Sequence, residues 1–152
     1  MSVEFMRLAL DLAHKAAAEG EVPVGCVVVR GGVVVGRGHN TREKDQNALA
    51  HAELTAIAQA CETVGFWRLP DCELFVTLEP CPMCAGAVIN ARVGKLVYGA
   101  SDPKAGACGS VVNLFAYPFN HKPEILGGVL ADESSALLTG FFKELRNSKQ
   151  DA

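Results

Sequence analysis

The pattern of hydrophobic and polar residues along the chain divides it into segments with helical spacing and segments that are continuous β-branched or apolar runs. Apolar side chains recur at helical spacing from Glu4 to Glu19, and Gly20 is a typical signal for the end of a helix. Two β-branched runs follow, Val24 to Arg30 and Val33 to Gly36, on either side of two glycines. Because a glycine pair between such runs favours a tight turn, these runs are predicted to form a β-hairpin.

Beyond the hairpin, the polar stretch from Gly38 to Ala48 is predicted to be a loop, and helices then alternate with strands. Helices are predicted over His51 to Thr63, Pro82 to Ala91 and Ala131 to Arg146; strands over Glu73 to Leu78, Lys95 to Ala100 and Glu124 to Leu130. Residues Ser101 to Gly109 are rich in glycine, alanine and proline and are expected to form a surface loop. This alternation predicts an α/β domain in which helices pack on a mixed sheet of five strands.

Composition and charge narrow the class of protein. A chain of 152 residues, 49% hydrophobic and 20% charged, is long enough for one globular domain, and we expect residues 1–152 to form one. No apolar run approaches the roughly 18 residues that a membrane span requires, so a soluble, intracellular protein is expected. The net charge of −3 gives no strong basic field for nucleic acid, although a local basic strip can still bind RNA.

The six cysteines are distributed unevenly. Cys81 and Cys84 form a C-x-x-C pair, whereas the other four are scattered among apolar or small neighbours. Disulfide frameworks belong mostly to shorter, secreted chains with small cores. We therefore expect the four scattered cysteines to be buried free thiols.

The strongest chemical signal is His51-Ala52-Glu53 followed, thirty residues after the histidine, by Cys81 and Cys84. One imidazole and two thiolates form a ligand set that suits tetrahedral zinc, and three protein ligands leave a fourth position for water. H-x-E followed by P-C-x-x-C is the signature of zinc-dependent nucleobase deaminases, in which the glutamate moves protons and does not bind zinc. His39 is a possible fourth ligand, which would close the site.

Helix geometry restricts where such a metal can lie. Residues two apart on a helix point roughly 200° away from each other, so His51 and Glu53 can meet one ion only beyond the N-terminal end of their helix. Cys81 and Cys84 share one helix face, again at a helix start. Two helix N-termini, whose dipoles favour thiolates, should therefore face the metal. Glu53 would take a proton from water and pass it to the substrate.

Each of these residues also has an interpretation that does not involve catalysis. Cys81 and Cys84 could form a redox pair or half of a structural zinc site, and the chain could be a non-catalytic zinc or RNA-binding module. Asn40 could be a turn residue or a base contact, because a side-chain amide both donates and accepts hydrogen bonds. Phe142 could be a surface neighbour of the core, or it could stack a base beside Lys143 and Arg146.

Longer motifs resemble the cytidine deaminase-like superfamily, and within it the bacterial tRNA-specific adenosine deaminases. The resemblance covers nearly the whole chain. The metal motif is shared by the superfamily, whereas segments after Tyr98 resemble the tRNA enzymes more narrowly. The matching segments are Glu21 to Gly25, Gly38 to Asn40, His51 to Glu53, Val76 to Ala87, Tyr98 to Ala100, Asp102, Lys104 to Gly106, Cys108 to Ser110, Asn120-His121, Gly128 to Glu133 and Phe141-Phe142.

The resemblance implies a three-layer α/β/α fold, one zinc ion per subunit, and conversion of the wobble adenosine in a tRNA anticodon loop to inosine. A water activated by zinc would attack C6 of the base while Glu53 moves protons. The resemblance also implies a homodimer whose active sites border the subunit interface, while the composition predicts a cytoplasmic protein. Asn40 would contact the flipped base and Pro23 and Val24 would wall its pocket. The residues that would meet the flanking nucleotides are Asp102, Lys104 and Phe142.

The chain departs from the family pattern in three places. Asn47-Ala48-Leu49-Ala50 stands where Asp-Pro-Thr is common before H-A-E, Ser101 stands where a basic residue is frequent, and the C-terminal tail is only weakly basic. All three differences concern RNA affinity and not deamination. The alternative function is therefore deamination of a free base or nucleotide of the guanine or cytosine type.

Overall fold

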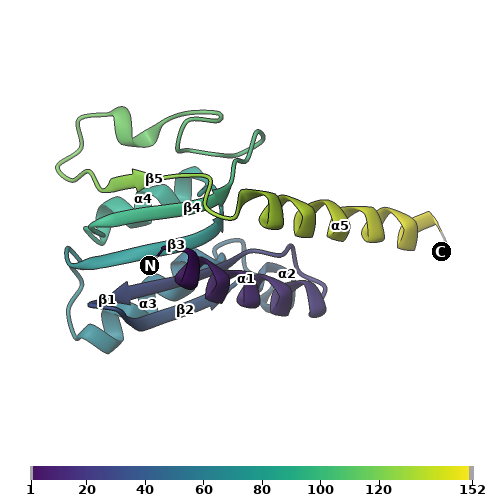
Figure 1. Ribbon diagram of the computed structural model, residues 1–152, viewed down its shortest axis with the longest axis horizontal. Helices are drawn as coiled ribbons and strands as arrows, with labels where there is room; N and C mark the ends of the chain where they lie inside the picture. The colour runs from purple at the N-terminus through teal and green to yellow at the C-terminus, as the bar shows by residue number, and fades with distance from the viewer. Residues whose placement is uncertain (1, 151–152) are drawn as a thin grey trace.

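One five-stranded sheet organises the molecule (Figure 1). The computed structural model describes residues 2–150. The strands are β1 (Gly25–Arg30), β2 (Val33–His39), β3 (Cys72–Leu78), β4 (Lys95–Ala100) and β5 (Glu124–Leu126), in the spatial order β2-β1-β3-β4-β5. β1 is antiparallel to both β2 and β3, whereas β4 is parallel to both β3 and β5. The predicted mixed sheet of five strands is confirmed.

Helices cover both faces of this sheet, which confirms the three-layer α/β/α arrangement. The helices are α1 (Ser2–Ala18), α2 (Arg42–Asp45), α3 (Ala52–Val64), α4 (Pro82–Asn90) and α5 (Ala131–Gln150), with a 3₁₀ turn, η1 (Leu114–Ala116). α1 and α5 pack on one face, and α3 and α4 pack on the other. Figure 1 shows α5 extending beyond the end of the sheet toward the C-terminus.

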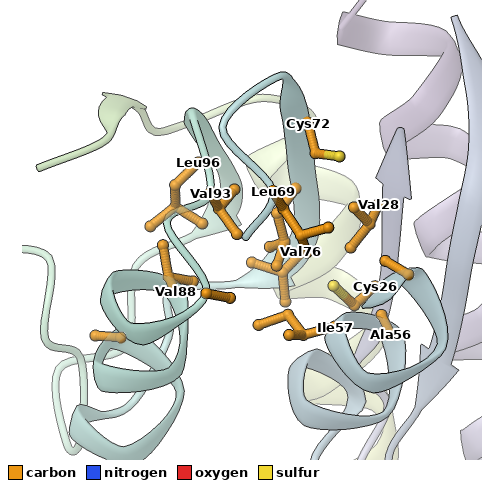
Figure 2. Packing of buried hydrophobic residues seen from close by; sticks show 14 of the residues in the cluster. Cys26, Val28, Ala56, Ile57, Leu69, Cys72, Val76, Val88, Val93 and Leu96 are labelled. Atoms are coloured by element: carbon orange, nitrogen blue, oxygen red, sulfur yellow. The ribbon is translucent and has the colours of Figure 1, made fainter. Parts of the chain in front are cut away.

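The two faces of the sheet are filled by alternate residues of the same strands. Val27 and Val29 of β1 lie in the cluster beneath α1, together with Phe75 of β3. Cys26 and Val28 point to the opposite face, where they pack with residues of α3 and α4 (Figure 2). Since side chains of a strand alternate between faces, a continuous apolar run of this kind is what a central strand covered on both sides requires.

A close approach between α3 and β2 fixes the start of α3 over the sheet. A Cβ atom added at Gly38 would lie 2.2 Å from the carbonyl oxygen of Ala52, and one at Gly36 would lie 2.2 Å from that of Ala56. Only glycine leaves room for helix backbone at these distances. The glycines of β2 thereby set the position of His51, which directly precedes α3.

The segment predicted to be a loop, Gly38 to Ala48, is more ordered than expected. β2 continues to His39, and α2 follows. The buried carboxylate of Glu21 holds this short helix by accepting hydrogen bonds from the backbone N–H groups of Glu43, at 3.0 Å, and Lys44, at 2.7 Å. Glu21 lies on a distant part of the chain, which explains why the local sequence did not predict the helix.

Other element ends also differ from the prediction. The last strand was predicted to reach Leu130, but β5 ends at Leu126, because two glycines follow and Gly128 has a φ of 88°. The last helix continues past Arg146 to Gln150, because the final residues include no helix-breaking proline or glycine. Within residues 2–150, no helix is both long and apolar enough to span a bilayer.

The cysteine prediction is correct in part. All six cysteines are free, and Cys26 and Cys72 are buried as expected. Cys61 and Cys108 are only partly buried. Cys61 lies near the C-terminal end of α3, and Cys108 lies in the segment after β4, so neither is enclosed as a strand residue would be.

Candidate active site and metal centre

Three potential metal ligands meet where two helices begin. His51 is the N-cap residue of α3, and Cys81 is the N-cap residue of α4, which begins at Pro82. Cys84 lies in the first turn of α4 and is buried. β3 ends just before Cys81, so the central sheet fixes the second helix start as the glycines of β2 fix the first.

The distances between these side chains fit a tetrahedral ion. The Nδ1 atom of His51 lies 3.4 Å from Sγ of Cys84 and 3.7 Å from Sγ of Cys81, and all three ligand atoms lie within 4.8 Å of one another. A tetrahedral zinc ion with Zn–N near ~2.0 Å and Zn–S near ~2.3 Å needs its N and S ligands about 3.5 Å apart. The donor types and their spacing therefore suit zinc, with Nδ1 as the donor atom of the imidazole.

Electrostatics in this cluster favour a thiolate at Cys81. A hydrogen bond from the Cys84 thiol lowers the pKa of Cys81 to about 4, with His51 adding a second hydrogen bond, and together they outweigh burial. The Cys81 hydrogen bond in turn raises the pKa of His51. A thiolate is the form of cysteine that binds metals.

Glu53 lies in the first turn of α3, beside the metal-ligand cluster. Its side chain is only 4% exposed. Burial raises the pKa of its carboxyl group, although its backbone N–H and the nearby His51 act in the opposite direction. A buried carboxyl group beside a metal can accept and return a proton without exchange with bulk water.

A pocket of about 140 Å³ opens over this cluster. Its volume is well below the ~300–1,000 Å³ of sites that enclose drug-sized ligands, so it suits one flat base better than a whole nucleotide. Apolar side chains form much of its wall and polar groups lie at a few points. The lining residues are Val22, Val24, Asn40, Arg42, His51, Ala52, Glu53, Leu78, Glu79, Cys81, Asp102 and Ala105.

His39 does not belong to the ligand group found among the described residues. Its Nε2 atom instead lies 2.7 Å from a carboxylate oxygen of Glu19. His39 therefore takes part in a polar contact that links the end of α1 to the end of β2. The candidate metal site therefore has three protein ligands.

Asn40 holds the turn after β2 and also lines the pocket. Its Nδ2 atom donates to the carbonyl of Val22 at 3.2 Å, and its Oδ1 atom accepts from the backbone N–H of Arg42 at 3.0 Å. These contacts hold the turn after β2. The amide still has a second N–H and a second lone pair, and the residue lines the pocket.

Of the other predicted substrate residues, two line the pocket, two line a separate hollow and one lines neither. Val24 and Asp102 line the pocket, whereas Pro23 is buried but does not line it, and Val22 takes the expected place beside Val24. Lys104 and Phe142 lie together in a separate hollow of about 350 Å³ between the segment after β4 and α5. Phe142 is 41% exposed there.

Two buried glutamates that sequence reasoning did not select also shape the site. Glu21 holds α2, and Glu79, at the end of β3, lines the pocket and accepts hydrogen bonds from the segment after β4. Burial alone would raise the pKa of Glu79, but hydrogen bonds from Ser110 and from backbone N–H groups keep it below the ordinary value. The available signal was a carboxylate directly after a mostly buried strand and directly before the metal motif.

Comparisons with known proteins agree with this geometry. The sequence profile of the MafB19-like deaminases matches residues 2–146. The tRNA-specific adenosine deaminase of Bacillus subtilis (strain 168) is 49% identical over 149 residues, which cover 97% of this chain and 92% of that protein.

Two solved structures provide further comparison. One, from a study of A-to-I editing by tRNA:A34 deaminases at the wobble position, superposes with a TM-score of 0.86 at 45% identity and covers 89% of this chain and 99% of its own. A guanine deaminase from Nitrosomonas europaea has a TM-score of 0.82 at 25% identity, with coverage of 93% and 84%. The chain is therefore a deaminase that belongs to the MafB19-like deaminases and, among them, to the family of the tRNA-specific adenosine deaminases.

Proposed function

We propose that this chain hydrolyses the 6-amino group of the wobble adenosine in a tRNA anticodon loop, giving inosine and ammonia, with residues 1–152 acting as one deaminase domain. The observation that carries the proposal is the buried Glu53 carboxyl group beside His51, Cys81 and Cys84 in a base-sized pocket. The high identity to tRNA-specific adenosine deaminases along nearly the whole chain supports the substrate.

We propose that the metal is zinc, one ion per subunit, held by His51, Cys81 and Cys84. The donor set and its spacing support this choice. Bound zinc would supply a water of lowered pKa next to the substrate. Two thiolates reduce the net charge on the ion, so a neighbouring base is needed to complete the proton transfer.

Glu53 is the group that supplies this base. Its carboxylate takes a proton from the attacking water and gives it to a ring nitrogen of adenine. It then takes the proton of the hydroxyl group newly bonded to C6 and gives it to the amino group, which leaves as ammonia while the carbonyl of inosine forms. Glu53 takes up and releases two protons in turn, so it ends the cycle in its starting form. Its place inside the pocket, with the entrance covered by the base, keeps these transfers away from bulk water.

The pocket walls suit an adenine ring that has left the stack of the anticodon loop. Val24 and Leu78 offer apolar surface, and the remaining N–H and lone pair of Asn40 can hydrogen-bond to the purine. Bases of a loop are already largely unstacked, so flipping one of them costs little free energy. The small volume leaves the ribose and its phosphates outside the pocket.

A neighbouring surface suits the rest of the RNA. Asp102 lines the pocket, and Lys104, two residues further on, lines the hollow that also contains Phe142. Arg146 and Lys149 add positive charge to this hollow. An aromatic ring among cations is the usual combination for stacking a flanking base and binding its phosphate. This local basic surface supports an RNA substrate despite the negative net charge.

We also propose that the chain acts as a cytoplasmic homodimer with active sites near the subunit interface, as the family resemblance implies. Large apolar side chains that remain exposed offer surface for such a contact, and the six free cysteines suit a reducing compartment. The exposed apolar side chains in question are Leu49, Val111, Tyr117 and Phe119. Light scattering of the purified chain measures its subunit number directly.

One assay tests the substrate. The zinc-loaded chain is incubated separately with a tRNA that has adenine at the wobble position, the same tRNA with guanine there, free adenosine, guanine and cytosine. Mass spectrometry of the products is expected to show inosine only in the first tRNA. Turnover of guanine or cytosine, with no inosine in tRNA, would replace the proposal with a free-base deaminase.

A further inference from the structure

The segment after β4 joins the two surfaces that we assign to the RNA, yet most of it lacks regular secondary structure. Asp102 and Ala105 line the base pocket, and Lys104 lines the hollow beside α5. Small shifts of this segment would therefore move the pocket wall together with Lys104, the cation that we assign to the RNA backbone. Something outside the segment has to fix its shape.

The side chain of Glu79 contacts the segment at both ends. One carboxylate oxygen accepts from the backbone N–H of Asp102 at 3.0 Å and from the hydroxyl of Ser110. The other accepts from the backbone N–H of Cys108 at 2.8 Å and from that of Ser110 at 3.2 Å. The carboxylate is 2% exposed, and its two oxygens accept four hydrogen bonds, all of them from this segment. Its capacity to accept hydrogen bonds is therefore filled.

The segment is also shaped to fit this carboxylate. A Cβ atom added at Gly106 would lie 2.4 Å from both Cδ and Oε2 of Glu79, so only glycine allows the chain to wrap around the group. The backbone N–H of Ala107 donates to the carbonyl of Pro80 at 2.8 Å, which adds a backbone contact next to Glu79. Within the segment, the Asp102 side chain accepts from the N–H groups of Lys104 and Ala105.

We propose that Glu79 is a positioning residue for substrate binding: its buried carboxylate holds residues 102–110 in the shape that presents Asp102 to the base pocket and Lys104 to the RNA backbone. This inference rests on the proposed function for the identity of the substrate. Glu79 acts through the segment and takes no part in the proton transfers of Glu53. Its loss therefore affects substrate binding more than the chemical step.

The test compares Glu79→Gln with Glu73→Gln, which removes a carboxylate from an exposed position of β3, the strand that directly precedes Glu79. An amide at position 79 keeps the size of the side chain but turns one oxygen into a donor that faces backbone N–H groups. We expect KM for an anticodon stem-loop RNA to rise about tenfold in Glu79→Gln while kcat changes little, the signature of lost binding common to ground and transition states. Glu73→Gln should match the unmodified chain.

Two further measurements separate positioning from general damage. Zinc content should stay at one ion per chain, and NMR amide exchange at Cys108 and Ser110 should accelerate by about tenfold or more, as expected for local opening. Unchanged KM would overturn the proposal, as would unchanged exchange. A loss of zinc together with kcat would also overturn it, because Glu79 would then act on the metal site.

Ser110→Ala keeps the test decisive if Glu79→Gln does not fold. It removes only the hydroxyl donor, so a smaller increase in KM is expected, with faster exchange at Cys108. Wild-type KM in Ser110→Ala, combined with failure of Glu79→Gln to fold, would assign Glu79 to folding and reject positioning. Failure of the proposed function is a separate result, since the unmodified chain would then form no inosine while the exchange comparison still reports on the segment.

Discussion

His51 and Cys81 occupy the same place in two different helices: each is the N-cap residue, and Nδ1 of His51 lies 3.7 Å from Sγ of Cys81. Neither side chain caps its own helix by a hydrogen bond. Both side chains are thus available to each other, and the positive ends of two helix dipoles are directed toward the thiol groups. The arrangement stabilises a thiolate and fixes two ligands on rigid elements that the central sheet supports.

Glu53→Gln should abolish turnover without loss of metal. The amide has nearly the same size, so the buried position beside the ligands stays filled, but it cannot accept a proton. We expect kcat to fall by about 10²–10⁴-fold, the usual contribution of a positioned acid–base group. Zinc measured by mass spectrometry should remain at the level of the unmodified chain. A variant with normal kcat would remove Glu53 from the mechanism.

Removal of the metal should stop the reaction reversibly. Dialysis against a zinc chelator is expected to abolish inosine formation, and added zinc should restore it. Cys84→Ser should bind zinc much more weakly, because a buried hydroxyl is a poorer ligand than a thiolate. The matched control is Cys72→Ser, a buried cysteine in β3 outside the ligand cluster, which should keep its zinc. Full zinc content in Cys84→Ser would contradict the ligand assignment.

Phe142→Ala should weaken RNA binding with little effect on folding. The ring is 41% exposed in the hollow beside Lys104, so its removal leaves no large cavity in the core. Loss of one stacked base should cost about 1–3 kcal/mol, which is about 5- to 150-fold in KM for the stem-loop RNA. Phe66→Ala removes a ring of similar exposure, 47%, from the segment that follows the C-terminal end of α3. Equal KM values for the two variants would exclude a stacking role for Phe142.

Lys104→Gln should reduce the dependence of RNA binding on salt. Each phosphate contact to single-stranded nucleic acid adds about 0.7 to the slope of log affinity against log salt concentration, so the slope should become shallower by about this amount. Lys122→Gln provides the control, because it follows His121 in the loop before β5, outside the hollow. An identical slope for Lys104→Gln and the unmodified chain would show that this lysine does not contact phosphate.

Elements that depend on local patterning could be predicted from the sequence, and those that depend on distant contacts could not. The run of β-branched residues in β1 predicted a strand, and the structure places Val27 and Val29 on one face of the sheet and Val28 on the other. The four residues of α2 are all outside the core, and the helix is held by Glu21, which lies about twenty positions away in the sequence. No local pattern contains that information.

The candidate site shows the same division. His51, Cys81 and Cys84 could be selected because their chemistry and spacing form a motif, and helix geometry placed them at two helix starts. The role of Glu79 could not be predicted from the sequence, because its partners are backbone N–H groups 23 to 31 residues further along the chain. Pro23 was expected in the pocket wall, whereas alternation along the chain puts Val22 and Val24 there.

Gly38→Ala should destabilise the fold because it separates α3 from β2. The added Cβ would lie 2.2 Å from the carbonyl oxygen of Ala52, so helix or strand must shift, at a cost of about 1–3 kcal/mol for overpacking. For a chain of this size, each kcal/mol lowers Tm by about 2–4 °C. Gly140→Ala is the matched control, since no atom lies within 4 Å of the added Cβ and α5 should gain about 0.5–1 kcal/mol. Because the same shift moves His51, Gly38→Ala should also bind zinc less tightly than Gly140→Ala. Equal Tm and equal zinc affinity in the two variants would show that the close approach of α3 to β2 does not set the position of the metal centre.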